Sequence, residues 1–157
     1  MKNNWGKLVF SLAICQLAGI IGSLFTTSAI GTWYSHLHKP SFNPPNWIFA
    51  PVWLTLFVLM GVAIFLIWRK GLKDKTRRFV FVLCMIHLGL NALWSIVFFG
   101  LHDTFLALLV IIALWGMILM LTLVFSKINK ISAYLMLPYL LWVTFASLLN
   151  FSIWLIN

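Results

Sequence analysis

The residues of this sequence that could do chemistry are few, and the most informative of them are spaced as on a helix. His87, Asn91 and Trp94 follow one another at steps of four and three residues, and Phe98 continues the series. This spacing places the four side chains on one helix face. A histidine and an asparagine in apolar surroundings need a hydrogen-bond partner or water. The pattern therefore indicates either an interhelical hydrogen bond or a polar anchor in a ligand cavity, and both alternatives stay open.

Aromatic side chains occur at helical spacing in two further apolar segments: Trp53 and Phe57 in one, and Trp142, Phe145, Ala146 and Leu149 in the other. If each helix turns one face inward, Trp53, Trp94 and Trp142 converge in the outer half of a membrane and enclose an apolar slot. A flat hydrophobic ligand fits such a slot. The alternatives are ordinary helix packing and a belt of tryptophans at the membrane interface.

The residues of conventional catalytic and metal sites are scarce. The only acids are Asp74 and Asp103, and there is no glutamate, so the chain lacks a carboxylate pair for acid–base catalysis and an acidic cluster for calcium or magnesium. Cys15 and Cys84 lie within apolar runs, where packing is the expected role. Three further histidines lie in two loops that the sequence does not place together. We expect no metal site and no required cofactor.

The composition is that of a polytopic membrane protein. Of 157 residues, 63% are hydrophobic and 8% are charged, whereas a soluble domain carries about 25% charged residues. Five apolar segments have about the 20 residues that cross a bilayer, at 8–30, 47–68, 79–99, 105–125 and 133–154. Because backbone groups in lipid must be satisfied internally, these segments are predicted to be helices. The predicted fold is an all-α membrane protein, a five-helix bundle forming a single domain over 1–157.

The basic residues predict how the bundle is oriented. Of eleven lysines and arginines, ten flank the predicted helices on one side, and only Lys39 lies on the other. The positive-inside rule then places the amino terminus in the cytoplasm and the carboxyl terminus outside. This distribution also accounts for the net charge of +9 without a nucleic-acid partner.

The loop over 31–46 faces outward under this topology and is rich in proline and aromatic residues. Pro40, Pro44 and Pro45 fix φ and stiffen the chain. The loop is predicted to fold over the outer mouth of the bundle as a lid, with Tyr34 and Phe49 beneath it. The alternative is a rigid connector lying in the membrane interface.

The chain resembles the translocator-protein family, TspO/MBR, in this loop and in two later segments. The matching residues are Trp33, Leu37, Lys39, Pro40, Phe42, Pro44, Pro45, Pro51, Val52 and Trp53, then Leu90, Asn91, Trp94, Phe98, Phe99 and Gly100, and finally Pro138, Tyr139, Trp142, Phe145, Ala146, Leu149 and Asn150. They occur in the family's order along essentially the whole chain.

The resemblance implies a membrane receptor or sensor that binds protoporphyrin IX and synthetic isoquinoline carboxamide or benzodiazepine ligands under the first loop. The expected ligand-binding residues are Tyr34, Pro44, Phe49, Trp53, Phe57, Asn91, Trp94, Trp142, Phe145, Ala146 and Leu149. An alternative is light- and oxygen-dependent porphyrin degradation, in which Trp53 and Trp142 would be catalytic. A tetrapyrrole transporter is a third reading, although the sequence shows neither an inverted repeat nor coupling residues.

Two further expectations concern the oligomeric state of the protein and the membrane in which it resides. Family members are often homodimers, and Gly19 with Ser23, and Ala18 with Gly22, permit close helix approach within or between subunits. The cholesterol motif of animal members needs a tyrosine and a basic residue near the end of the last helix, and the stretch 149–154 has neither. The resemblance therefore favours a bacterial plasma membrane and gives no support for sterol binding.

Overall fold

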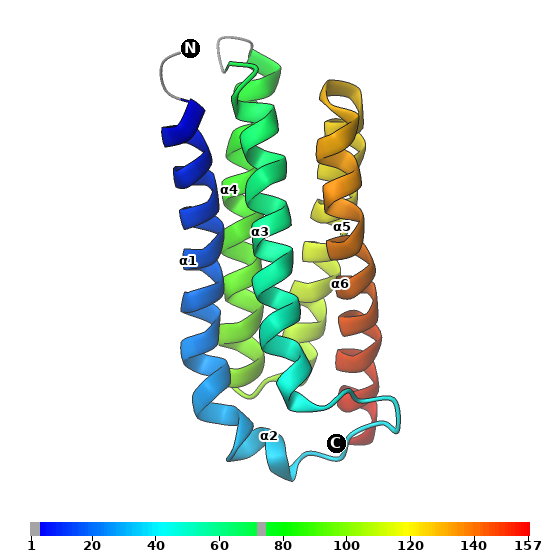
Figure 1. The fold of residues 1–157 in the computed structure, drawn as a ribbon. Coiled ribbons are helices and arrows are strands. Elements are labelled where there is room, and N and C mark those ends of the chain that lie inside the picture. Colours follow the sequence, from blue (N-terminus) through cyan, green and yellow to red (C-terminus); the bar gives the residue numbers. More distant parts are fainter. Residues whose placement is uncertain (1–3, 72–74) are drawn as a thin grey trace.

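Five long helices and a short one make up almost all of the structure. The computed structural model describes residues 4–71 and 75–157. The elements are α1 (Asn4–Ile30), α2 (Trp33–His36), a 3₁₀ turn η1 (Asn46–Ile48), α3 (Phe49–Trp68), α4 (Lys75–Ser95) continued by a π-helical turn η2 (Ile96–Gly100), α5 (Thr104–Ile128) and α6 (Lys130–Ile156). The long helices run side by side, and the chain begins and ends at opposite ends of the bundle (Figure 1).

Among the described residues, five helices are long and apolar enough to cross a membrane, with α3 counted together with η1 and α4 together with η2. They have 23 to 27 residues, and at 1.5 Å per residue each exceeds the thickness of the hydrocarbon core. The predicted all-α fold with five spans is confirmed. The described residues include no strand.

Helices α5 and α6 extend a few residues beyond the predicted apolar runs, and polar residues cap them. Asp103 accepts a hydrogen bond at 2.8 Å from the amide of Leu106 and begins α5. Asn129 ends α5, and its side chain accepts a bond at 3.0 Å from Ile131 to begin α6. Hydropathy marks where the chain enters lipid, whereas capping decides where the helix ends.

Small residues let α1 approach its neighbours within the subunit. A Cβ added to Gly61 of α3 would lie 2.9 Å from the Leu12 side chain of α1. Gly19 faces the ring of Phe57, and Gly22 faces the side chain of Ser95. The small residues of α1 thus face into the bundle, and the homodimer stays a prediction that this feature does not support.

The described basic residues other than Lys39 gather at the end of the bundle where the chain begins (Figure 1). There Lys70 donates to the carbonyl of Ile128 and Arg77 donates to the carbonyl of Lys70, which ties the link between α3 and α4 to the end of α5. Lys2, Lys73 and Asp74 lie outside the described residues. Which end faces the cytoplasm stays a prediction.

The loop between α1 and α3 crosses the opposite end of the bundle and passes the end of α6 (Figure 1). The amide of His38 donates to Oδ1 of Asn157 at 2.9 Å, and Nδ2 of Asn157 donates to the carbonyl of His38 at 3.0 Å. Within the loop, Asn43 closes a turn onto the carbonyl of Pro40 at 3.0 Å. The loop is therefore fastened to the bundle.

Candidate functional site

A cavity of about 330 Å³ lies between α1, α3, α4 and α6 at the end of the bundle that the loop crosses. Its wall is formed by side chains of these four helices, together with η2, Tyr34 of α2 and Asn46 of η1. Among the described residues, α5 contributes nothing to the lining. The fifth helix instead packs against α4 and α6. The cavity is thus bordered by four helices and covered at one end by the loop.

Most of the predicted ligand-binding residues line this one cavity: Tyr34, Phe49, Trp53, Phe57, Asn91, Trp94, Trp142, Ala146 and Leu149. Pro44 and Phe145 do not line it. The ring of Phe145 lies 5.5 Å from that of Trp142 and 6.2 Å from that of Phe42, so it supports the wall and the loop from behind. The carbonyl of Pro44 accepts a bond from the Asn43 side chain at 3.0 Å. Ligand contact by any of these residues remains a prediction.

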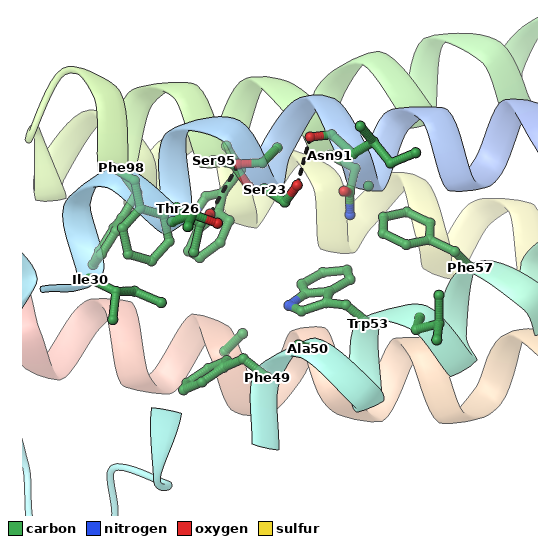
Figure 2. A pocket seen from close by; sticks show the side chains of 18 of the residues that line it. Ser23, Thr26, Ile30, Phe49, Ala50, Trp53, Phe57, Asn91, Ser95 and Phe98 are labelled. Atoms are coloured by element: carbon green, nitrogen blue, oxygen red, sulfur yellow. Dashed lines mark hydrogen bonds between the residues drawn. The ribbon is translucent and has the colours of Figure 1, made fainter. Parts of the chain in front are cut away.

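Three tryptophans from three helices converge on the cavity. Trp53 stacks on Phe57 at 5.5 Å between ring centroids, and Figure 2 shows the two facing the same space. Trp94 donates from Nε1 to Oδ1 of Asn150 at 3.0 Å, which fixes its indole plane. The Nε1 atom of Trp142 is buried and has no hydrogen-bond partner among the described residues. An unpaired buried donor is costly. Because Nε1 itself is buried, the ring of Trp142 borders the cavity and its N–H does not face it.

The polar face of α4 forms interhelical hydrogen bonds and also borders the cavity, whereas ligand anchoring by this face stays a prediction. Nδ2 of Asn91 donates to the hydroxyl of Tyr139 at 2.8 Å, and Nε2 of His87 lies 3.0 Å from the same oxygen. These are interhelical hydrogen bonds between α4 and α6. His87 is fully buried and outside the cavity, whereas Asn91 lines it (Figure 2). Asn91 therefore serves both as a structural partner and as a polar point of the cavity.

Sequence reasoning missed the contribution of α1. Gln16, Gly19, Ser23 and Thr26 line the cavity opposite Trp53. Ser23 and Thr26 satisfy their hydroxyls on carbonyls of their own helix, at 2.8 and 3.0 Å. Hydroxyls bonded in this way occur anywhere in a membrane helix. The residue types of α1 alone therefore did not predict that this helix lines a cavity. The signal that was available is their position on the same helix face as Gly19.

The side of the cavity between α1 and α3 reaches the outer surface of the bundle. Two lining residues, Ile20 and Leu54, are 56% and 60% exposed. Nε2 of Gln16 donates to the carbonyl of Leu54 at 3.3 Å and bridges the two helices at this place. In a membrane this surface faces hydrocarbon. The cavity therefore has a side opening toward lipid.

The loop end of the cavity is closed more firmly. Tyr34 is buried, and its hydroxyl donates to Oδ1 of Asn43 at 2.9 Å. Nζ of Lys39 lies 4.7 Å from the centre of the Tyr34 ring. Burial raises the pKa of the Tyr34 hydroxyl, and the bond to Asn43 opposes that rise. The phenol is therefore neutral at physiological pH and seals the cavity on the side of the loop.

The loop histidines are engaged separately. The ring of His102 stacks on Trp33 at 4.4 Å, and Nδ1 of His36 lies 2.6 Å from the carbonyl of Thr32. Within the described ranges no group of three or more histidine, cysteine or acidic residues could hold a metal ion.

With this geometry in hand, comparison with known proteins identifies the family. The profile of the TspO/MBR family matches residues 11–155. The chain belongs to the TspO/MBR family. Together with the five helices able to span a bilayer, this membership makes it a multi-pass membrane protein.

Relatives in the TspO/MBR family come from all three domains of life. The tryptophan-rich protein TspO of Archaeoglobus fulgidus is 42% identical over 96% of this chain and 97% of its own length. The translocator protein of Homo sapiens is 34% identical over 88% of this chain and 83% of its own. The tryptophan-rich sensory protein of Cereibacter sphaeroides is 31% identical over all of this chain and 95% of its own. The resemblance found in the sequence is confirmed.

Proposed function

We propose that this protein is a membrane receptor or sensor that binds porphyrins such as protoporphyrin IX, and drug-like isoquinoline carboxamide or benzodiazepine ligands, in the cavity beneath the 31–46 loop. The observation that carries the proposal is the convergence of Trp53, Trp94 and Trp142 on one cavity. Ring stacking on an indole adds about 0.5–1.5 kcal/mol to the burial of apolar area. The name of the sensory relative is consistent with this role.

The two classes of ligand differ in how well they fit the volume of the cavity. A volume of about 330 Å³ is in the range that holds drug-sized molecules. A porphyrin macrocycle is larger, so its edge would extend through the side opening between α1 and α3. There the exposed side chains of Ile20 and Leu54 would cover it with apolar surface. Bound porphyrin would then be shared between the protein and the surrounding lipid.

A titration in the dark tests the proposal. Purified protein in detergent is titrated with protoporphyrin IX while tryptophan fluorescence is followed, and an isoquinoline carboxamide is then added as a competitor. We expect saturable quenching that the competitor reverses, because both ligands occupy the space between the same three indoles. Quenching that fails to saturate, or that the competitor leaves unchanged, would contradict a shared site.

Porphyrin degradation is a second candidate, because Trp53 and Trp142 face one cavity. Electron-rich indoles beside an excited porphyrin can be oxidised, and within the described residues no group of three or more histidine, cysteine or acidic side chains could hold a metal ion. Illumination of the complex in air should then bleach the porphyrin absorbance. A double variant, Trp53→Phe with Trp142→Phe, should retain binding and lose bleaching. Stable absorbance under light in the wild-type protein would reject degradation and leave the receptor.

A further inference from the structure

Tyr139 and His87 lie outside the cavity, yet they contact the amide that forms its polar point. We propose that these two positioning residues determine whether Asn91 presents its amide oxygen or its amide nitrogen to the cavity, which is called here the polarity of Asn91. This polarity is reversible. The cavity therefore recognises both ligands that donate a hydrogen bond and ligands that accept one. This inference rests on the proposed function and names the ligand chemistry that the site selects.

The three residues form a linear relay from the cavity into the core. Nδ2 of Asn91 lies 2.8 Å from the hydroxyl of Tyr139, and Nε2 of His87 lies 3.0 Å from the same hydroxyl. Tyr139 and His87 are 0% exposed, whereas Asn91 borders the cavity opposite Phe57 and Trp53 (Figure 2). The hydroxyl of Tyr139 is therefore the link between the cavity amide and the buried imidazole.

The number of available protons decides which group donates and which accepts in each hydrogen bond of the relay. A tyrosine hydroxyl has one proton to donate. Because the Asn91 amide group donates to the Tyr139 oxygen, the hydroxyl proton is free to go to Nε2 of His87. That nitrogen must then be the unprotonated one of a neutral ring, and the proton of the ring sits on Nδ1. The carbonyl oxygen of Asn91 is left for the cavity, which in this state accepts a hydrogen bond.

The opposite direction needs only an amide rotation and a change of tautomer. With the Asn91 amide turned by half a rotation, its oxygen accepts from the Tyr139 hydroxyl, and the Tyr139 oxygen accepts from a proton on Nε2 of His87. One proton leaves Nδ1 and one arrives at Nε2, so the charge is unchanged. The ring of His87 is buried in either tautomer, so the Tyr139 hydroxyl, which lies against Nε2, selects between them. Exchange with solvent during local opening supplies the route for the proton.

A second amide that lines the cavity is locked and shows the contrast. Oδ1 of Asn150 accepts from the indole of Trp94 at 3.0 Å, and its Nδ2 donates to the carbonyl of Thr104 at 2.9 Å. An indole N–H only donates and a carbonyl only accepts, so the amide of Asn150 has one orientation. The partner of Asn91 is a hydroxyl, which does both. Of these two amides, that of Asn91 is therefore the one whose polarity can follow the ligand.

Flat tricyclic probes separate the two states. Carbazole offers one N–H donor and fluorene lacks it, whereas acridine offers one acceptor nitrogen and anthracene lacks it. We expect carbazole and acridine each to bind the wild-type protein roughly three- to tenfold more tightly than its hydrocarbon, the worth of one neutral hydrogen bond. Nitrogen-15 NMR of His87 at alkaline pH should show the proton on Nδ1 with carbazole and on Nε2 with acridine.

Two variants test whether the tautomer responds through Tyr139. Tyr139→Phe severs the relay, so His87 should show the same tautomer with both probes while all four probes still bind. Thr122→Val is the matched control: it removes a buried hydroxyl from α5, which donates to the carbonyl of Ile118 and lies off the cavity. This control should keep the change of tautomer. If Tyr139→Phe does not fold, the His87 tautomers of the wild-type protein with carbazole and with acridine decide whether the relay exists.

One tautomer with both probes in the wild-type protein would overturn the relay, as would a change of tautomer that persists in Tyr139→Phe. Binding of all four probes with such a result would leave the proposed function intact. Failure of all four probes, and of protoporphyrin IX, to bind would overturn the proposed function and the relay together.

Discussion

At the scale of single residues, the volume of the cavity depends on a missing side chain as well as on the side chains that line it. Gly19 has no side chain, and an added Cβ would lie 2.5 Å from Cε2 of Phe57. Both residues line the cavity, so the space between α1 and α3 exists because one of them is a glycine. The glycine was predictable as a close-approach residue. Its partner was not, because spacing along one helix says nothing about which ring of another helix it faces.

Gly19→Ala should therefore weaken ligand binding. The ring of Phe57 must move to admit the methyl group, and overpacking of this kind costs about 1–3 kcal/mol. The matched control is Gly89→Ala in α4, since a Cβ there meets nothing within 4 Å. Titration with an isoquinoline carboxamide and thermal unfolding in detergent measure the two effects. Equal behaviour of the two variants would show that the Gly19–Phe57 contact does not shape the site.

At the scale of elements, the five spans could be predicted because hydropathy and length alone decide what crosses a bilayer. The face that each helix turns inward was predictable for α3, α4 and α6, whose tryptophans mark it. It was not predictable for α1, whose lining has no aromatic residue and consists of glycine, serine, threonine, isoleucine and one glutamine. The fastening of the loop was also out of reach, because Asn157 and His38 are 119 positions apart.

Asn157→Ala should speed ligand release without unfolding the bundle. The variant loses both hydrogen bonds to His38, each worth about 1 kcal/mol, so the loop leaves the cavity mouth more often. Dissociation rates from stopped-flow fluorescence should rise several-fold. Ser152→Ala is the control, because its hydroxyl donates only to the carbonyl of Leu148 on its own helix. A rate unchanged in Asn157→Ala would mean that release proceeds through the side opening instead.

At the scale of the whole molecule, charge is concentrated at one end and the cavity lies near the other. The described lysines and arginines other than Lys39 lie at the end opposite the loop, and the loop caps the cavity. The positive-inside rule uses this separation of charge. The separation could be predicted from the sequence because it does not depend on how the helices pack. The order of helices around the cavity, with α5 excluded, needed the structure.

The orientation itself is open to measurement. We expect the basic end in the cytoplasm of a plasma membrane and the loop outside. In a background where Cys15 and Cys84 are serine, His38→Cys should react with a membrane-impermeant maleimide on intact cells, and Arg78→Cys should react only after permeabilisation. Both side chains are exposed on the surface of the bundle, at its opposite ends. The reverse pattern would invert the topology.

The central claim is that ligands occupy the space between the tryptophans of α3, α4 and α6. It is tested most directly by filling that space from Ala146, which lines the cavity and is 7% exposed. Affinity for protoporphyrin IX in the dark is compared between Ala146→Phe and Ala13→Phe, a control that adds the same ring to the exposed side of α1. The account predicts that Ala146→Phe loses at least tenfold in affinity while remaining folded and that the control binds as the wild type does. Equal affinity in the two folded variants would contradict it.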